Sequence, residues 1–212
     1  MSAGVLSERG LFVCFEGGEG AGKSTQSRLL HDWLLERGET VLLTFEPGDT
    51  SVGKELRRIV LDPATGDLSD RTEALLYAAD KAEHVDHVVL PALARGEVVI
   101  TDRYVDSTLA YQGAGRTLDV GEVEAVARWA TGDLRPHLTV VLDLDPEAGL
   151  DRLSGRDRIE GQSLAFHQRV RQGFLDLAAA DPERYLVLDA RAPVDEIAGS
   201  IRQRVAPLLE RS

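Results

Sequence analysis

The chain has 212 residues, of which 43% are hydrophobic and 28% are charged, and this combination predicts one globular domain with a single core. Its formal net charge of -12 argues against a nucleic-acid-binding protein, because such proteins need a basic surface to neutralise phosphates. The longest apolar run, residues 88–94, is too short to span a bilayer, and the first residues do not resemble a signal peptide. We therefore expect a cytoplasmic protein without membrane contact.

Five apolar runs rich in β-branched residues predict buried strands, at residues 11–15, 40–45, 98–101, 138–143 and 185–188. Helical periodicity follows each of them, at residues 24–37, 71–95, 120–131, 164–180 and 194–209. This alternation predicts an α/β fold, a three-layer sandwich whose five-stranded parallel sheet is covered on both faces. We expect one domain over residues 11–210, after an N-terminal extension of residues 1–10.

The first predicted strand leads into a phosphate-binding loop. Gly17, Gly22, Lys23 and Ser24 match the pattern G-x-x-x-x-G-K-[ST] between a strand and a helix, which is the context that this motif requires. Backbone N–H groups of such a loop bind phosphate, its lysine reaches the β and γ phosphates of ATP, and its hydroxyl ligates Mg²⁺. The loop residues predicted to bind ATP are Gly17, Gly18, Glu19, Gly20, Ala21, Gly22, Lys23, Ser24 and Thr25.

A second acid should stand at the end of a neighbouring strand, near the Mg²⁺ ion. Asp102 and Asp143 both end predicted strands, and we favour Asp102 because Arg103 follows it and could bind an acceptor phosphate. Asp143 is interpreted as a strand-end residue or a cap for the helix that begins at Pro146. Glu16 is expected to brace the phosphate-binding loop.

The class of nucleotide-binding protein is narrowed by what the sequence lacks. It has no asparagine and hence no N-K-x-D motif for guanine, and it is too short for a large motor ATPase, which leaves a compact kinase. The segment "RLSGRDR" is predicted to form a lid at about residues 152–160, which could bring arginines to the transferred phosphoryl group. The candidate catalytic residues are Lys23, Arg103, Arg152, Arg156 and Arg158. Which lid arginine acts stays open.

The motifs "EPGDTSVGKELR", "RTEALLYAADKAEHV", "DRYVDSTLAYQGAGR" and "DRIE" follow the phosphate-binding loop in this order. With them the sequence resembles the bacterial-type thymidylate kinases from about Leu11 to the last helix. The resemblance implies a P-loop nucleoside monophosphate kinase fold, a homodimer, and transfer of phosphate from ATP to dTMP with Mg²⁺.

The same resemblance implies roles for individual residues. Arg57 and Arg103 would hold the acceptor phosphate, Tyr77 would stack on thymine, and Tyr111 would press against the sugar, where Glu19 would meet the 3′-hydroxyl. The predicted dTMP-binding residues are Glu19, Glu46, Arg57, Tyr77, Lys81, Arg103, Thr108, Tyr111 and Gln112. Ser24 and Asp102 would hold Mg²⁺, directly or through water. Arg191 either lies against adenine or is a simple turn residue.

Four positions depart from the usual pattern of the resembled family: Phe45, Asp49, Lys81 and Glu83. Two alternatives therefore stay open, a kinase for another nucleoside monophosphate such as dUMP, and a nucleotide-binding module without turnover. His84 and His87 could in principle bind a metal, but no third ligand at suitable spacing is evident, so we interpret them as packing or surface residues.

Overall fold

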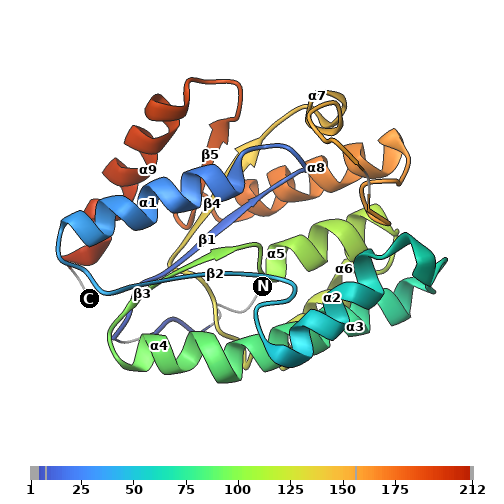
Figure 1. Ribbon diagram of the computed structural model, residues 1–212, viewed down its shortest axis with the longest axis horizontal. Helices are drawn as coiled ribbons and strands as arrows, with labels where there is room; N and C mark the ends of the chain where they lie inside the picture. Colours follow the sequence, from blue (N-terminus) through green and yellow to red (C-terminus); the bar gives the residue numbers. More distant parts are fainter. Residues whose placement is uncertain (1–4, 8, 156, 211–212) are drawn as a thin grey trace.

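The computed structural model describes residues 5–7, 9–155 and 157–210, and its centre is a five-stranded parallel sheet (Figure 1). The strand order is β2-β3-β1-β4-β5. The strands are β1 Phe12–Gly17, β2 Val41–Phe45, β3 Val98–Asp102, β4 Leu138–Asp143 and β5 Tyr185–Asp189. They coincide with the predicted strands apart from small differences at the ends, so the predicted sheet is confirmed.

Helices cover both faces of the sheet, as the alternating pattern predicted (Figure 1). Helices α1, Lys23–Glu36, and α9, Val194–Leu209, pack on one face, where their apolar side chains meet Val13 and Phe15 of β1. The other face is covered by α4 Leu90–Ala94, α6 Val120–Ala130 and α8 Leu164–Ala180, while α3 Asp70–His84 packs beside α6. Because Phe12 and Cys14 alternate with Val13 and Phe15, β1 is buried from both sides.

The predicted helix 71–95 is divided in the structure. A π-helical segment, η2 Val85–Val89, separates α3 from α4, and α4 has a proline in its first turn. Proline has no N–H, so it cannot donate the usual α-helical hydrogen bond to the preceding turn. The wider π-helical turn before it accommodates the missing donor. The chain nevertheless continues in helical turns through the whole predicted range.

Further helical segments lie between the predicted elements in the described part of the chain. Helix α2, Ser51–Leu61, and the 3₁₀ turn η1, Pro63–Thr65, follow β2, while α5, Val105–Thr108, and the π-helical segment η3, Leu109–Gly115, follow β3. Helix α7, Pro146–Leu150, begins where expected, but its N-cap is Asp145, whose carboxylate accepts the Glu147 N–H. The capping role suggested for Asp143 is therefore wrong, whereas its position at the end of β4 is confirmed.

Glycine at the end of η3 lets two helical elements approach closely. A Cβ on Gly115 would lie 2.7 Å from the ring of Phe166 in α8, so a larger residue would push α8 away.

Part of the predicted N-terminal extension is hydrogen-bonded to the rest of the domain, because the Val5 N–H donates to Asp133 O at 2.9 Å. In the described part of the chain, no helix combines the length and the hydropathy that crossing a membrane requires.

Candidate active site

The phosphate-binding loop joins β1 to α1, in the context that the motif predicted. Gly17, Gly20 and Gly22 have φ angles of 133°, 66° and 92°, which favour glycine. A Cβ would lie 2.4 Å from the backbone oxygen of Leu142 at Gly17, and 2.4 Å from that of Gly149 at Gly20. The loop therefore needs glycine at these two positions for space as well as for conformation.

Lys23 lies inside the loop at the start of α1. Its Nζ donates to Gly17 O at 3.0 Å and to Gly18 O at 2.8 Å. Burial lowers the pKa of Lys23, and the positive charge of Arg103 adds to this, so the pKa lies below its usual value. A phosphate in the loop would supply the negative charge that the buried ammonium group favours.

Ser24 and Asp102 come together where β1 and β3 end. The Ser24 hydroxyl donates to Asp102 Oδ2 at 2.7 Å, although the two residues are far apart in the sequence. These oxygens fit Mg²⁺, which typically takes one or two protein oxygens and completes its shell with water and phosphate. Among the described residues no group of three or more His, Cys, Asp or Glu side chains could hold a metal.

The other strand-end acid has a different partner. Asp143 accepts two hydrogen bonds from the guanidinium of Arg171, at 2.6 and 2.9 Å. Since the Asp143 carboxylate is occupied by Arg171, the geometry favours Asp102 over Asp143 as the acid near the Mg²⁺ position.

Arg103 connects the loop with a neighbouring cavity. Its φ of 75° is unusual for a residue with a side chain, and such strain is often found at functional sites. The guanidinium donates to Gly17 O, Ser107 Oγ and Glu19 Oε1 at 3.2, 3.1 and 2.7 Å. It also lies over the ring of Tyr111, 5.0 Å from the centroid.

The two acids of the loop have separate partners. Glu19 accepts from Arg103 and from the Tyr111 hydroxyl, the latter at 2.7 Å. Burial alone would raise the pKa of Glu19, but the charges of Arg103 and Lys23 outweigh it and lower the pKa to about 2. Glu19 is therefore an anion on the side of the loop that faces the neighbouring cavity.

Glu16 braces a different segment from the one expected. Its buried carboxylate accepts from the backbone N–H groups of Tyr104 and Ser107 at 2.8 and 3.0 Å, and from the Ser107 hydroxyl at 2.6 Å. These donors belong to the start of α5, not to the phosphate-binding loop. Glu16 thus fixes the chain that follows Arg103.

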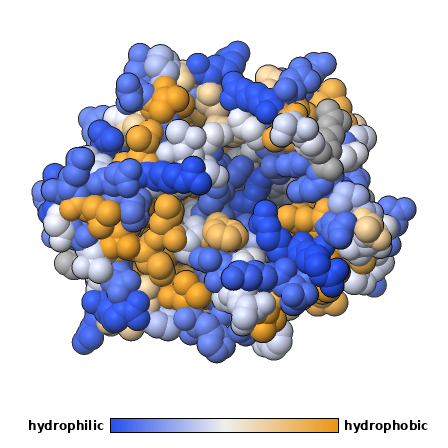
Figure 2. Space-filling model, in the orientation of Figure 1, coloured by the Kyte–Doolittle hydropathy of each residue, from blue (hydrophilic) through white to orange (hydrophobic). Residues whose placement is uncertain are grey.

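Two cavities meet at this edge of the sheet. The first, the P-loop cavity, is lined by Glu19, Gly20, Ala21, Gly22, Lys23, Ser24, Thr25, Ser27, Arg28, Leu43, Thr44, Phe45, Glu46, Arg57, Asp102 and Arg103. Figure 2 shows a hollow with mainly hydrophilic walls on the face of the molecule that Figure 1 presents. The predicted loop residues from Glu19 to Thr25 thus face one space, together with Asp102.

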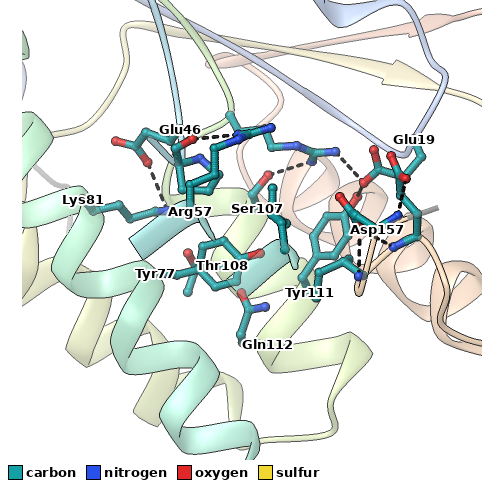
Figure 3. A pocket seen from close by; sticks show the side chains of 15 residues that line it. Glu19, Glu46, Arg57, Tyr77, Lys81, Ser107, Thr108, Tyr111, Gln112 and Asp157 are labelled. Carbon is teal, nitrogen blue, oxygen red and sulfur yellow. Dashed lines mark hydrogen bonds and ion pairs between the residues drawn. The ribbon is translucent and has the colours of Figure 1, made fainter. Parts of the chain in front are cut away.

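The second, the Tyr77 cavity, brings every predicted dTMP-binding residue together (Figure 3). Those residues are Glu19, Glu46, Arg57, Tyr77, Lys81, Arg103, Thr108, Tyr111 and Gln112. Its other lining residues were not predicted individually: Pro47, Leu61, Ser107, Asp157, Ile159 and Glu160. The motif "DRIE" was the available signal for the last three.

Lys81 and Glu46 form a buried ion pair at one end of the Tyr77 cavity. Lys81 Nζ lies 3.0 Å from Glu46 Oε2, and both side chains are almost fully buried. His84 Nδ1 lies 2.7 Å from Glu46 Oε1, and its Nε2 lies 2.6 Å from Thr44 Oγ1. Burial opposes ionisation of Glu46, yet Lys81 and His84 lower its pKa. His84 is thus a packing residue of this network, as expected.

Two of the departures from the usual family pattern lie beside this network. Thr44 donates to Asp49 at 2.5 Å, which turns the acid of Asp49 inward. Phe45 lies under Arg57, whose guanidinium carbon is 5.8 Å from the ring centroid and which also donates to Pro47 O at 2.7 Å. Phe45 therefore supports the orientation of the predicted phosphate-binding Arg57.

The predicted lid arginines have different surroundings. Arg152 donates to Gly20 O at 3.0 Å and so lies against the phosphate-binding loop. Arg158 is turned away from the loop and pairs with the buried Glu73, and it also donates to Val60 O at 2.8 Å. Arg156 lies outside the described residues. Arg191 forms an exposed pair with Asp189, and its contact with adenine stays a prediction.

Comparison with known proteins agrees with the resemblance seen in the sequence. The family model described as Thymidylate kinase matches residues 15–201. A thymidylate kinase of Cutibacterium acnes is 59% identical over 202 residues, covering 95% of this chain and 99% of that protein. One of Clavibacter michiganensis is 53% identical over 204 residues, covering 94% and 96%.

Among solved structures, the crystal structure of thymidylate kinase from Ehrlichia chaffeensis superimposes with a TM-score of 0.78 at 29% sequence identity, covering 93% of this chain and 99% of that one. The fold, the loop and the family model thus agree over most of the length. The chain belongs to the thymidylate kinase family.

Proposed function

We propose that this protein transfers the γ-phosphoryl group of ATP to dTMP, giving ADP and dTDP. The observation that carries the proposal is that the P-loop cavity and the Tyr77 cavity share Glu19, Glu46, Arg57 and Arg103. A nucleotide in each cavity would direct its phosphates toward these shared residues. Family membership supports ATP as the donor and dTMP as the acceptor.

In the P-loop cavity, the loop N–H groups and Lys23 would hold the phosphates of ATP. Ser24 and Asp102 would hold Mg²⁺, directly or through water, and the bound ion would neutralise charge on the β and γ phosphates. Arg152 lies beside Gly20 and would add positive charge to the transferred group when the lid closes. We propose the same role for Arg156, whereas the buried pair of Arg158 with Glu73 favours a positioning role for Arg158.

In the Tyr77 cavity, Arg57 and Arg103 would hold the phosphate of dTMP, and Tyr77 would stack on the base. Tyr111 would close the space beside C2′ of the sugar, and Glu19 would accept a hydrogen bond from the 3′-hydroxyl. An oxygen of the acceptor phosphate then forms a bond to the γ-phosphorus, while the bond from that phosphorus to the β,γ-bridging oxygen breaks and ADP leaves with the electron pair. The acceptor phosphate is itself an anion, so the protein needs no general base.

Two further aspects belong to this proposal. Family resemblance supports a homodimer in the cytoplasm. The structure adds an apolar groove between α3 and α6, where Leu75 is 58% exposed, as a suitable contact surface.

The test is ADP release with ATP and Mg²⁺ across dTMP, dUMP, dCMP, dAMP and dGMP. We expect turnover with dTMP to exceed that with the other acceptors. Turnover that is higher with another acceptor would reassign the substrate, and no single-turnover transfer to any acceptor would support the non-catalytic alternative.

A further inference from the structure

Glu73 of α3 lies behind the wall of the Tyr77 cavity, outside the set of residues predicted for catalysis or binding. It is 1% exposed. Its carboxylate accepts from Gln112 Nε2 at 2.9 Å, from Arg116 Nε and Nη2 at 3.0 Å each, and from Arg158 Nη2. Burial raises the pKa of Glu73, but the hydrogen bonds from Arg116, Gln112 and Arg158 outweigh it and keep the pKa below its usual value.

An ionised carboxylate can only accept hydrogen bonds. Gln112 must therefore turn its NH₂ group toward Glu73, which leaves its carbonyl oxygen Oε1 for the cavity. Gln112 lines that cavity, below Tyr77 and Thr108 in Figure 3, and its Oε1 has no hydrogen-bond partner among the described residues. The two arginines use the remaining acceptor positions of Glu73, so the carboxylate cannot rotate without losing their hydrogen bonds.

Thr108, four residues before Gln112, also lines the cavity. It is 2% exposed, and its Oγ1 is fully buried without a hydrogen-bond partner within the described part of the chain. Because a buried atom of this kind is closed to the cavity, Gln112 Oε1 is the acceptor that the base would meet there.

Gln112 Oε1, held as a hydrogen-bond acceptor, distinguishes nucleobases by whether N3 carries a hydrogen. Thymine and uracil carry a hydrogen on N3, whereas N3 of cytosine has a lone pair that would face the lone pairs of Gln112 Oε1. A site built to pair with an N–H group discriminates strongly against an analogue that lacks it, because the site's own polar atom then stays unpaired.

We propose that Glu73 is a positioning residue that fixes the Gln112 amide and thereby selects a pyrimidine with a hydrogen on N3, while Arg116 and Arg158 hold Glu73 in place. The inference rests on the proposed function, since it assumes that the base of the acceptor occupies the Tyr77 cavity. It also gives Arg158, in the predicted lid segment, a role at the base end of the site.

The test compares kcat/KM for dTMP and dCMP in the wild type and in Glu73→Gln. A neutral amide at position 73 can donate as well as accept, so the Gln112 amide is free to turn and to offer either group to the base. We expect the ratio of kcat/KM for dTMP to that for dCMP to fall by about tenfold or more. Glu83→Gln is the matched control on the same helix, because Glu83 pairs with the exposed His87 at 3.7 Å and does not line the Tyr77 cavity, so the ratio should stay unchanged.

Gln112→Leu gives a second variant that keeps both arginine pairs of Glu73. It should lower the ratio by a similar factor, and the double variant should lower it no further, because both changes remove the same fixed acceptor. If Glu73→Gln lowers the melting temperature and both kcat/KM values equally, with the ratio unchanged, the inference is overturned and Glu73 is structural only. A wild type that does not use dTMP would instead overturn the proposed function.

Discussion

At the scale of the residue, Glu19 keeps its charge in a buried position because Arg103 and Lys23 lie beside it. Its folded pKa of about 2 is lower than the value near ~4.3 of an unfolded chain, so the unfolded state binds more protons between these two values. The ionised carboxylate therefore stabilises the fold above about pH 4.3. This contribution is lost as the pH falls from there toward 2.

Glu19→Gln should make the free energy of unfolding depend less on pH below about pH 4.3. The shift corresponds to at most ~3 kcal/mol, and the variant should lose this amount at pH 7 and progressively less as the pH falls from about 4.3 toward 2. Urea unfolding between pH 2.5 and 7 measures the difference in the free energy of unfolding between the wild type and the variant. Glu36→Gln, on the exposed face of α1, is the control. An equal loss of stability at every pH would show that the carboxylate acts by packing and not by charge.

At the scale of the element, the short helix α5 is fixed by an acid from a different strand. Glu16 accepts from Tyr104 N–H, Ser107 N–H and the Ser107 hydroxyl, so β1 determines where the chain after β3 turns into α5. Arg103 precedes this turn and also donates to Ser107. The position of the proposed phosphate-binding guanidinium therefore depends on Glu16.

Glu16→Ala should destabilise the protein by about 3 kcal/mol, because it leaves several buried donors without an acceptor. Glu16→Gln keeps one carbonyl acceptor and should cost less. Both variants should raise the KM for dTMP more than the KM for ATP, since Arg103 and Ser107 line the Tyr77 cavity. Chemical denaturation and initial-rate kinetics measure these effects, and an unchanged KM for dTMP in Glu16→Ala would contradict the bracing role.

The phosphate-binding loop allows a matched test of its backbone. A Cβ on Gly20 would lie 2.4 Å from Gly149 O in α7, and its φ is 66°, whereas a Cβ on Gly18 would meet nothing within 4 Å. Gly20→Ala should therefore displace the loop from α7 and raise the KM for ATP by about tenfold or more, at a strain of ~1 to 3 kcal/mol. Gly18→Ala is the control, and equal effects of both variants would show that the contact with α7 is unimportant.

At the scale of the whole molecule, the sequence predicts the sheet and the phosphate-binding loop because both depend on local patterns. Buried strands need continuous apolar runs, and the loop needs glycines next to Lys23 and Ser24. The resemblance to the family additionally predicted which residues line the Tyr77 cavity.

The network behind that cavity could not be predicted in the same way. Glu73 and Arg158 are 85 positions apart, and neither local periodicity nor spacing indicates that they pair. Helix α2 had a signal that was not used, since Val52, Leu56 and Ile59 recur at helical spacing after Thr50, its N-cap. The roles of charged residues thus depend on tertiary partners, and Arg158 is an example because its charge alone suggested phosphate binding.

The proposed homodimer is tested through the groove between α3 and α6. Leu75 is 58% exposed beside Leu118 and Val126, and a second copy of the chain would remove this apolar surface from water. Leu75→Glu should therefore convert a dimer into a monomer, because a buried, unpaired carboxylate at such an interface is costly. Light scattering coupled to size-exclusion chromatography measures the mass, with Leu35→Glu on α1, 48% exposed, as control. A wild type with the mass of one chain would contradict the homodimer, and a Leu75→Glu variant that stays dimeric would place the interface elsewhere.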